Sequence, residues 1–252
     1  MQITFTPTKK QDKVFDLFED EDTTEILFGG GVGAAKTYLM SSLITIKCLQ
    51  YEGIRVGLCR NELTTLKKTT VVTLLSEVFP NFGLIKDEHY KYNPIEGKIT
   101  FYNKSEIVFQ ELRHIPSDPN YTRLGGLLLT FAVIDEAGET EAKGKEILQS
   151  RIGRWRNESY RIKPLLIMTC NPSRNFLYDD FYLADKEGTL PYYRKFVNAT
   201  GLDNPYLSEA YIENLKRTLT PSEVNRLLLG NWESQDDPDN LVSSDDIFEM
   251  YD

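Results

Sequence analysis

The stretch Gly29-Gly30-Gly31-Val32-Gly33-Ala34-Ala35-Lys36-Thr37 decides the fold of this 252-residue chain. The apolar run before it, residues 25–28, predicts a buried strand, and the segment that follows, residues 37–50, predicts a helix. Glycines between a strand and a helix let backbone N–H groups point toward an anion, and the helix dipole favours negative charge at that end. The sequence therefore predicts a phosphate-binding loop at the carboxyl end of a strand.

The loop satisfies the pattern G-x-x-x-x-G-K-[ST] counted from Gly30, except that Ala35 replaces the last glycine. In that pattern the ammonium of Lys36 reaches the β and γ phosphates, and the hydroxyl of Thr37 meets Mg²⁺. We therefore expect ATP to contact Gly29, Gly30, Gly31, Val32, Gly33, Ala34, Ala35, Lys36 and Thr37. We expect a negative φ at Ala35, since a left-handed residue costs about 1–2 kcal/mol. A glycine-rich turn without a ligand is the alternative.

A second element, Phe131-Ala132-Val133-Ile134-Asp135-Glu136-Ala137, is an apolar strand that ends in two carboxylates. Mg²⁺ keeps most of its waters and is held by one or two carboxylates plus phosphates, so Asp135 is a candidate metal ligand. Glu136 could then activate the attacking water, which favours hydrolysis over phosphoryl transfer to a small molecule. The alternative is that the pair only caps a following helix.

A third element, Leu165 to Pro172, is an apolar strand that ends in polar residues and a proline. At the carboxyl edge of a parallel sheet, Thr169 and Asn171 could sense the γ phosphate or orient water. An ordinary turn at the strand exit explains the same residues.

Strand and helix patterns alternate along the chain, which is typical of an α/β protein with a mainly parallel sheet. From His89 to Leu112 the apolar period changes to two, which predicts an inserted antiparallel meander. The first predicted helix opens at Thr6-Pro7. Further predicted strands are residues 54–59, 127–134, 164–168 and 192–197, and further predicted helices are residues 62–79, 208–215 and 221–229.

Composition excludes several classes of protein. A net charge of −9 with 40% apolar residues is ordinary for a globular chain, and residues 233–252 carry eight of the acids and no basic residue, so residues 1–232 are close to neutral. The three cysteines and two histidines form no zinc-binding pattern, and scattered cysteines suit a reducing compartment. We expect a soluble intracellular protein, because no apolar stretch is long enough to span a membrane.

These motifs in this order resemble one family, the large terminase subunit of tailed bacteriophages, the motor that packages double-stranded DNA. The resemblance covers about residues 5–232. Its elements are residues 6–11 (TPTKKQ), the glycine loop, Arg60 after the second strand, Arg123 ahead of Asp135-Glu136-Ala137, Thr169-Cys170-Asn171-Pro172, and Asp203-Asn204-Pro205-Tyr206 leading to Leu229-Gly230-Asn231-Trp232. It implies a P-loop NTPase fold of the ASCE, RecA- and helicase-like type, with a small C-terminal helical lid.

The resemblance also implies roles for single residues. Gln11 matches the glutamine that reads adenine, and Arg60 joins the nucleotide-binding set. Lys36 and Thr37 match the Walker A pair, Asp135 the Mg²⁺ carboxylate, Glu136 the catalytic base, and Thr169 to Asn171 the coupling motif. Arg123 matches an arginine that reaches the ATP of a neighbouring subunit, in trans. A solvated first-turn residue is the alternative for Gln11, and a surface ion pair is the alternative for Arg123.

We therefore expect a Mg²⁺-dependent ATPase that drives double-stranded DNA into procapsids. It would act as a ring, a pentamer by analogy, with the portal protein and the small terminase subunit, at the portal vertex in the host cytoplasm. The predicted domains are the ATPase core (residues 1–197), the lid (198–232) and an acidic linker (233–252) toward a nuclease domain that this chain is expected to lack. In the linker, Ile247, Phe248 and Met250 hint at a docking segment.

Residues 151–163 form a basic segment in which Arg151, Arg154 and Arg156 are candidate contacts to DNA phosphates. Ion pairs within the fold or between subunits explain the same arginines. Two rival functions remain open for the whole chain: a helicase-like DNA-dependent ATPase, and a nucleotide-binding assembly module that does not hydrolyse ATP.

Overall fold

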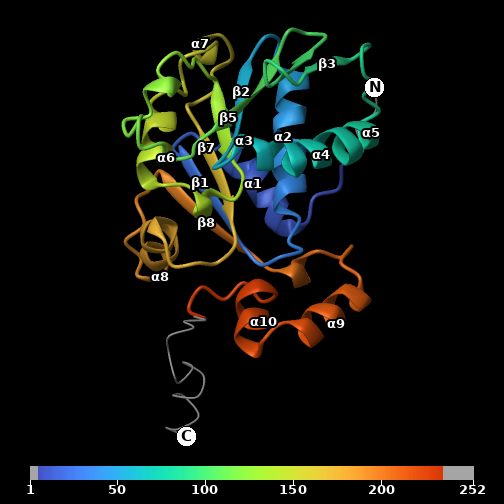
Figure 1. Cartoon of the computed structure of the whole chain (residues 1–252), viewed down its shortest axis with the longest axis vertical. Helices are drawn as coiled ribbons and strands as arrows, with labels where there is room; N and C mark the ends of the chain where they lie inside the picture. Colours follow the sequence, from blue (N-terminus) through green and yellow to red (C-terminus); the bar gives the residue numbers. More distant parts are fainter. Residues whose placement is uncertain (1–4, 235–252) are drawn as a thin grey trace, which may run out of the picture.

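The computed structural model describes residues 5–234, which form an eight-stranded sheet with helices on both faces (Figure 1). The strand order is β3-β4-β5-β2-β6-β7-β1-β8. The strands are Glu25–Gly30 (β1), Arg55–Arg60 (β2), Tyr90–Asn93 (β3), Lys98–Phe101 (β4), Glu106–Glu111 (β5), Phe131–Ile134 (β6), Leu166–Cys170 (β7) and Arg194–Ala199 (β8). Both neighbours of β4 are antiparallel to it, and every other pair in the sheet is parallel, which confirms the α/β prediction and its inserted meander.

Two hydrophobic cores flank the sheet, because side chains alternate between its faces. Val14, Leu39 and Phe79 from helices cover one face, and Leu148, Phe181 and Trp232 cover the other. The helices are Lys9–Glu19 (α1), Lys36–Gln50 (α2), Leu63–Lys68 (α3), Thr70–Thr73 (α4), Phe79–Asn81 (α5), Ala142–Gln149 (α6), Asn157–Tyr160 (α7), Ala184–Lys186 (α8), Glu209–Thr218 (α9) and Pro221–Leu227 (α10). Burial of the inner strands on both faces explains their continuous apolar sequences.

The first helix begins at Lys9, later than the predicted opening at Thr6-Pro7. Thr8 caps the helix, and its partner is Gln11: the Gln11 N–H donates to Thr8 Oγ1 at 3.3 Å, and the Thr8 N–H donates to Gln11 Oε1 at 2.9 Å. This reciprocal pair satisfies two free backbone donors at once, so the helix starts where the capping box forms.

The predicted helix of residues 62–79 is interrupted at Thr69 and contains a π-helical turn, Leu74–Val78, before α5. Thr69 has φ −119° and ψ −78°, outside the helical range, so the chain restarts at Thr70. The restart lets the Thr70 hydroxyl donate to a carboxylate at the end of β6, Asp135, at 2.6 Å. A tertiary contact therefore overrides the helical periodicity.

The predicted strand of residues 127–134 is shorter in the structure, where β6 spans Phe131–Ile134. Its partner β2 pairs from Val56 to Phe131, and below that point Thr130 turns away from the ladder. The Thr130 hydroxyl accepts from Arg55 N–H and donates to the Trp155 carbonyl. Strand pairing therefore ends where this side chain replaces it.

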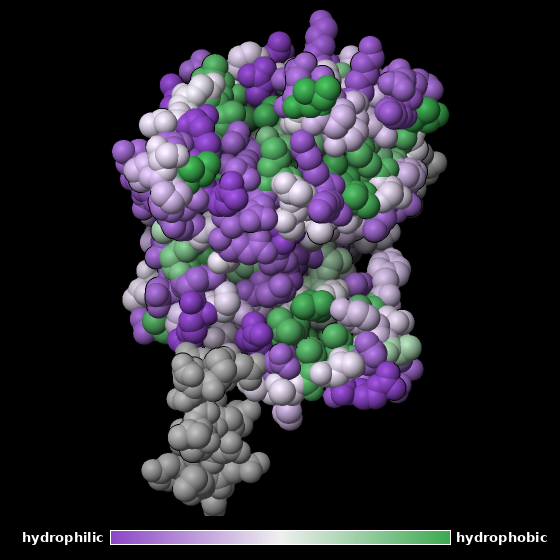
Figure 2. All heavy atoms as spheres, in the orientation of Figure 1, coloured by the Kyte–Doolittle hydropathy of each residue, from purple (hydrophilic) through white to green (hydrophobic). Residues whose placement is uncertain are grey.

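The C-terminal helices α9 and α10 lie below the sheet, beside the carboxyl end of β1 (Figure 1). Neither contains a buried residue, and apolar side chains gather on the face of this region seen in Figure 2. After α10 the chain returns to the body, where Glu233 accepts hydrogen bonds from Tyr178, Tyr182 and Lys186. The domain boundaries stay a prediction, and most of the acidic linker, with Ile247, Phe248 and Met250, lies outside the described residues.

No helix within residues 5–234 combines the length and the apolar character that a membrane span requires.

Candidate nucleotide-binding site

The site forms where three neighbouring parallel strands end. β7 lies between β1 and β6, so the glycine loop after β1 faces both the Asp135-Glu136 pair after β6 and the Thr169–Asn171 segment at the end of β7. Residues about a hundred positions apart in sequence thereby converge on one edge of the sheet. The sequence prediction that these motifs share one site is consistent with this geometry.

The glycine loop approaches neighbouring backbone more closely than a side chain allows. Gly30 has φ 143°, and a Cβ there would overlap the carbonyl of Ala199. The Gly31 N–H donates to the same carbonyl at 2.9 Å, and the Val32 N–H donates to Leu227 O. Within residues 5–234 the N–H groups of 33–37 donate to no protein acceptor, which suits a loop that binds an anion.

The expectation of a negative φ at Ala35 is wrong: Ala35 has φ 53° and ψ 39° and is the N-cap of α2. The left-handed turn directs the chain from the loop into the helix, which is the task that glycine performs in the usual pattern. Contacts on both sides hold the conformation, because the Ala35 carbonyl accepts from Leu39 N–H at 3.0 Å and from Gln11 Nε2 at 3.4 Å.

Lys36 is buried, with 7% of its surface exposed, and all three ammonium protons are used. Its Nζ donates to the carbonyls of Gly30 at 2.9 Å and Gly31 at 2.8 Å, and to Asn171 Oδ1 at 2.8 Å. Burial lowers the pKa of Lys36, and the charges of Glu136 and Asp135 oppose that effect. Because Asn171 is the side-chain partner, it is the one that can rotate away when a phosphate oxygen arrives.

Asp135 is buried at 1% exposure and is surrounded by threonine hydroxyls. Thr169 Oγ1 donates to its Oδ1 at 2.8 Å, and Thr70 Oγ1 donates to its Oδ2 at 2.6 Å. Thr37 Oγ1 lies 3.2–3.3 Å from both carboxylate oxygens. The predicted strand-end carboxylate is therefore oriented by two strong hydrogen bonds and faces the predicted hydroxyl.

These oxygens fit Mg²⁺. Adjacent ligands of an octahedral ion with bonds of about 2.0–2.1 Å lie about 2.9 Å apart, close to the separation of Thr37 Oγ1 from the Asp135 carboxylate. Residues 5–234 hold no cluster of three or more His, Cys, Asp or Glu side chains. The donor set is hence typical of an ion that shares its coordination with phosphates and water, and not of an all-protein metal site.

Glu136 follows Asp135 with φ 51°, a left-handed turn that points its side chain into the pocket. Burial raises the pKa of the Glu136 carboxyl, Asp135 adds to the rise, and Lys36 opposes it. Asn171 Nδ2 lies 3.4 Å from Glu136 Oε2, so the Asn171 amide connects the lysine to the glutamate. The predicted base and the predicted sensor are therefore in direct contact.

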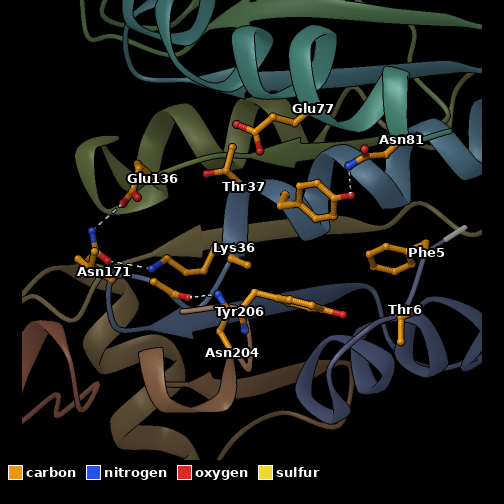
Figure 3. Close-up of a pocket in the computed structure, with 14 residues that line it drawn as sticks. Phe5, Thr6, Lys36, Thr37, Glu77, Asn81, Glu136, Asn171, Asn204 and Tyr206 are labelled. Atoms are coloured by element: carbon orange, nitrogen blue, oxygen red, sulfur yellow. Dashed lines mark hydrogen bonds between the residues drawn. The ribbon is translucent and has the colours of Figure 1, made fainter. Parts of the chain in front are cut away.

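These side chains line a pocket of about 740 Å³, in which Glu136 and Asn171 lie at one end and Phe5 and Thr6 at the other (Figure 3). Seven lining residues were not predicted as nucleotide contacts: Phe5, Thr6, Tyr38, Glu77, Asn81, Asn204 and Tyr206. Asn204 and Tyr206 belong to a motif that the resemblance had marked without assigning a role. The others carry no sequence signal, because only the fold brings the N-terminal segment and the π-helical turn to this pocket.

Gln11 and Arg60 lie outside the pocket lining. Gln11 is 3% exposed, so it is not a solvated residue, and its amide is held by the capping box and the Ala35 carbonyl. Arg60 forms two hydrogen bonds with Glu139, at 2.9 and 3.1 Å, and a third with Thr69. Both residues support the site from behind in this structure, and their predicted contacts with nucleotide stay predictions.

Arg123 is held by its own chain. Its Nη1 donates to Asp118 Oδ2 at 2.8 Å, Nη2 donates to the Arg113 carbonyl, and the guanidinium lies over the Tyr121 ring. The Asp118 carboxylate also accepts from Thr122, which lowers the pKa of that carboxyl strongly. Arg123 would have to leave this ion pair to reach a neighbouring subunit.

The basic segment lies at the opposite edge of the sheet from the pocket. Its helix α7 is at the far end of the molecule from α10 (Figure 1). Arg151 donates to the Gly125 carbonyl and Arg156 to the Glu52 carbonyl, while Arg154 is exposed. The structure therefore does not bring the predicted DNA contacts to the predicted ATP site.

The sheet order, the glycine loop after β1 and the polar strand ends at β6 and β7 define a P-loop ATPase fold of the RecA-like class. The chain belongs to the phage terminase large subunit family, whose model matches residues 21–223. No curated protein matches the chain.

Solved structures of large terminases share the fold. The large terminase of a thermophilic bacteriophage, in complex with ADP, is 19% identical, with a TM-score of 0.69 over 90% of this chain and 54% of that one. The ATPase domain of the Thermus phage P74-26 large terminase is 12% identical, with a TM-score of 0.63 over 91% of this chain and 95% of that one. The HK97 bacteriophage large terminase is 14% identical, with a TM-score of 0.61 over 89% and 50%. The chain thus spans about half the length of the ADP-bound terminase and of the HK97 protein.

Proposed function

We propose that this chain is the ATPase domain of a terminase motor: it hydrolyses ATP with Mg²⁺ and uses the energy to move double-stranded DNA into a procapsid. The observation that carries the proposal is the convergence of Lys36, Asp135, Glu136 and Asn171 on one pocket behind the glycine loop. Relatives in complex with ADP and ATP-γ-S show that the fold elsewhere in the family accepts such nucleotides.

The residues define a hydrolytic step. A water molecule attacks the γ phosphorus, Glu136 accepts the proton that the water loses, and the bond from the γ phosphorus to the β–γ bridging oxygen breaks to give ADP and phosphate. Lys36 neutralises charge on the phosphates, and Asn171 exchanges its bond to Lys36 for one to the substrate or the water. When bound between Thr37 and Asp135, Mg²⁺ would offset the charge of the β and γ phosphates.

The motor would act as a ring of subunits in the host cytoplasm, at the portal vertex of the procapsid. Its partners would be double-stranded DNA, the portal protein, the small terminase subunit and further copies of this chain. Arg123 would complete a neighbour's site in trans once it leaves Asp118, because a guanidinium stabilises the transition-state charge on the phosphates. Family membership supports these partners.

Replacement of the base tests the proposal. Glu136→Gln keeps the shape and removes the proton acceptor, so phosphate release should fall by about 10²–10⁴-fold while ADP binding persists. Glu146→Gln, on the exposed face of α6, is the matched control and should change neither quantity. Equal phosphate release by Glu136→Gln and the wild type would contradict hydrolysis at this site, and a wild type that binds ADP without turnover, even as an assembled ring, would support the assembly module instead.

A further inference from the structure

The end of the pocket away from Glu136 is lined by aromatic rings. Phe5 lies against Phe15, Tyr38 and Phe82, with ring centroids 5.6, 6.2 and 6.4 Å away, so the ring is held in a fixed aromatic wall. Phe5 and Tyr38 both line the pocket. This wall is built by the N-terminal segment, α2 and the residues after α5.

Tyr206 reaches the same pocket from the loop that precedes α9 (Figure 3). Its ring is 77% exposed, although its backbone is anchored to the glycine loop. Asn204 provides the anchor: its Nδ2 donates to the Gly33 carbonyl at 2.8 Å, and its Oδ1 accepts from Tyr206 N–H at 3.1 Å. A large apolar ring is thus fixed in position at the mouth of the pocket without a packing partner of its own that would explain it.

The amides at this end are largely engaged already. Both ends of the Gln11 amide and both ends of the Asn204 amide have protein partners, and Asn81 Nδ2 donates to Tyr38 Oη at 3.1 Å. A base-specific pocket needs free donors and acceptors aimed at the base edge, since discrimination arises when such groups are left unpaired by the wrong ligand. The rings, in contrast, offer open faces.

We propose that the nucleobase is held by its faces, stacked between Tyr206 and the Phe5–Tyr38 wall, and that the site accepts adenine and guanine nucleotides with little discrimination. The inference rests on the proposed function, because it requires that Lys36 and the glycine loop hold the phosphates. Stacking on an aromatic ring stabilises any purine, since every base has a π face. Tyr206 is therefore a binding residue supplied by the C-terminal helical region, and an occupied site ties that region to the loop.

Equilibrium binding of ADP, GDP and pyrophosphate, each with Mg²⁺, tests the proposal on the whole chain. The dissociation constants of ADP and GDP for the wild type should agree within about threefold. Tyr206→Ala should weaken both by about tenfold and leave pyrophosphate unchanged, because pyrophosphate has no base to stack. Tyr206→Phe should bind ADP as the wild type does, because the ring face persists.

Tyr192→Ala is the matched control: Tyr192 is 72% exposed and lies just before β8, at the opposite edge of the sheet, so nucleotide binding should not change. Equal weakening of pyrophosphate and ADP by Tyr206→Ala would show a structural role and overturn the proposal, as would unchanged ADP binding. A preference above tenfold between ADP and GDP would overturn recognition by faces. A wild type that binds neither ADP nor pyrophosphate would refute the proposed function itself.

Discussion

At the scale of single residues, the site is held by strained backbone. Ala35 and Glu136, the residues before the lysine and after the Asp135 carboxylate, both have a left-handed conformation, with φ 53° and 51°. Such a conformation costs about 1–2 kcal/mol in a residue with a Cβ and persists only where surrounding contacts fix it. Here the contacts come from Gln11, which bonds the Ala35 carbonyl, and from Thr169 Oγ1, which accepts from Glu136 N–H at 3.2 Å.

Ala35→Gly should relieve strain. A glycine adopts positive φ freely, which offsets the entropy it adds to the unfolded chain, so the free energy of unfolding should stay the same or rise by about 1 kcal/mol. Ala34→Gly is the matched control: Ala34 is buried without positive φ, so the free energy of unfolding should fall by about 1 kcal/mol. Urea unfolding measures both, and a larger loss in Ala35→Gly would contradict the left-handed geometry.

The pH dependence of hydrolysis should report the environment of Glu136. Burial raises the pKa of this carboxyl above its ordinary value of 4.5. The proposed base acts only when deprotonated, so the rate should rise with pH as the pH passes through the raised pKa, and the midpoint of the acidic limb should lie above 4.5. The turnover number at saturating ATP, measured from about pH 5 to pH 8, tests this. A rate independent of pH across that range would contradict it.

At the scale of elements, helix α6 is joined to strand β1 by a buried ion pair. Lys145 Nζ lies 2.6 Å from Glu25 Oε2, with 5% and 4% of the two side chains exposed, and Gln149 also donates to Glu25 at 2.7 Å. Arg194, on β8, contacts the same carboxylate at 3.3 Å. The pair fixes α6 against the start of the strand that carries the glycine loop.

Lys145→Met should lower the free energy of unfolding by about 3 kcal/mol, because Glu25 would stay buried with fewer partners. Lys143→Met is the control on the same helix: its ion pair with Glu146 is more than half exposed on both sides, and its loss should change the free energy by less than about 0.5 kcal/mol. Chemical denaturation compares the two variants. Similar losses would show that the buried pair does not hold α6.

At the scale of the whole molecule, the nucleotide pocket and the basic segment occupy opposite edges of one sheet. The segment is rigidly attached: Trp155 Nε1 donates to the Gly53 carbonyl at 2.9 Å and Tyr160 Oη donates to the Glu52 carbonyl at 2.8 Å. Arg156 and Arg161, at the two ends of α7, have left-handed backbones. If DNA binds there, its effect on hydrolysis must pass through the sheet.

Arg154→Gln combined with Arg156→Gln should weaken DNA binding and DNA-stimulated ATP hydrolysis and leave ADP binding unchanged. Two lost phosphate contacts should reduce the slope of log K against log salt by about 2. Lys216→Gln with Arg217→Gln, on the exposed face of α9, is the matched control. Unchanged DNA affinity and slope in the first double variant would remove these arginines from the DNA interface.

Sequence alone determined the class of fold, the glycine loop, the paired carboxylates and the family, because each depends on local patterns: a period of two or 3.6, and residue types with fixed chemistry at fixed spacing. The tertiary structure decided what depends on distant neighbours. The left-handed Ala35, the break at Thr69 that brings Thr70 to Asp135, the ion pair that holds Arg123 and the aromatic pocket wall all arise where packing and hydrogen bonds from other elements outweigh the local preference of the chain.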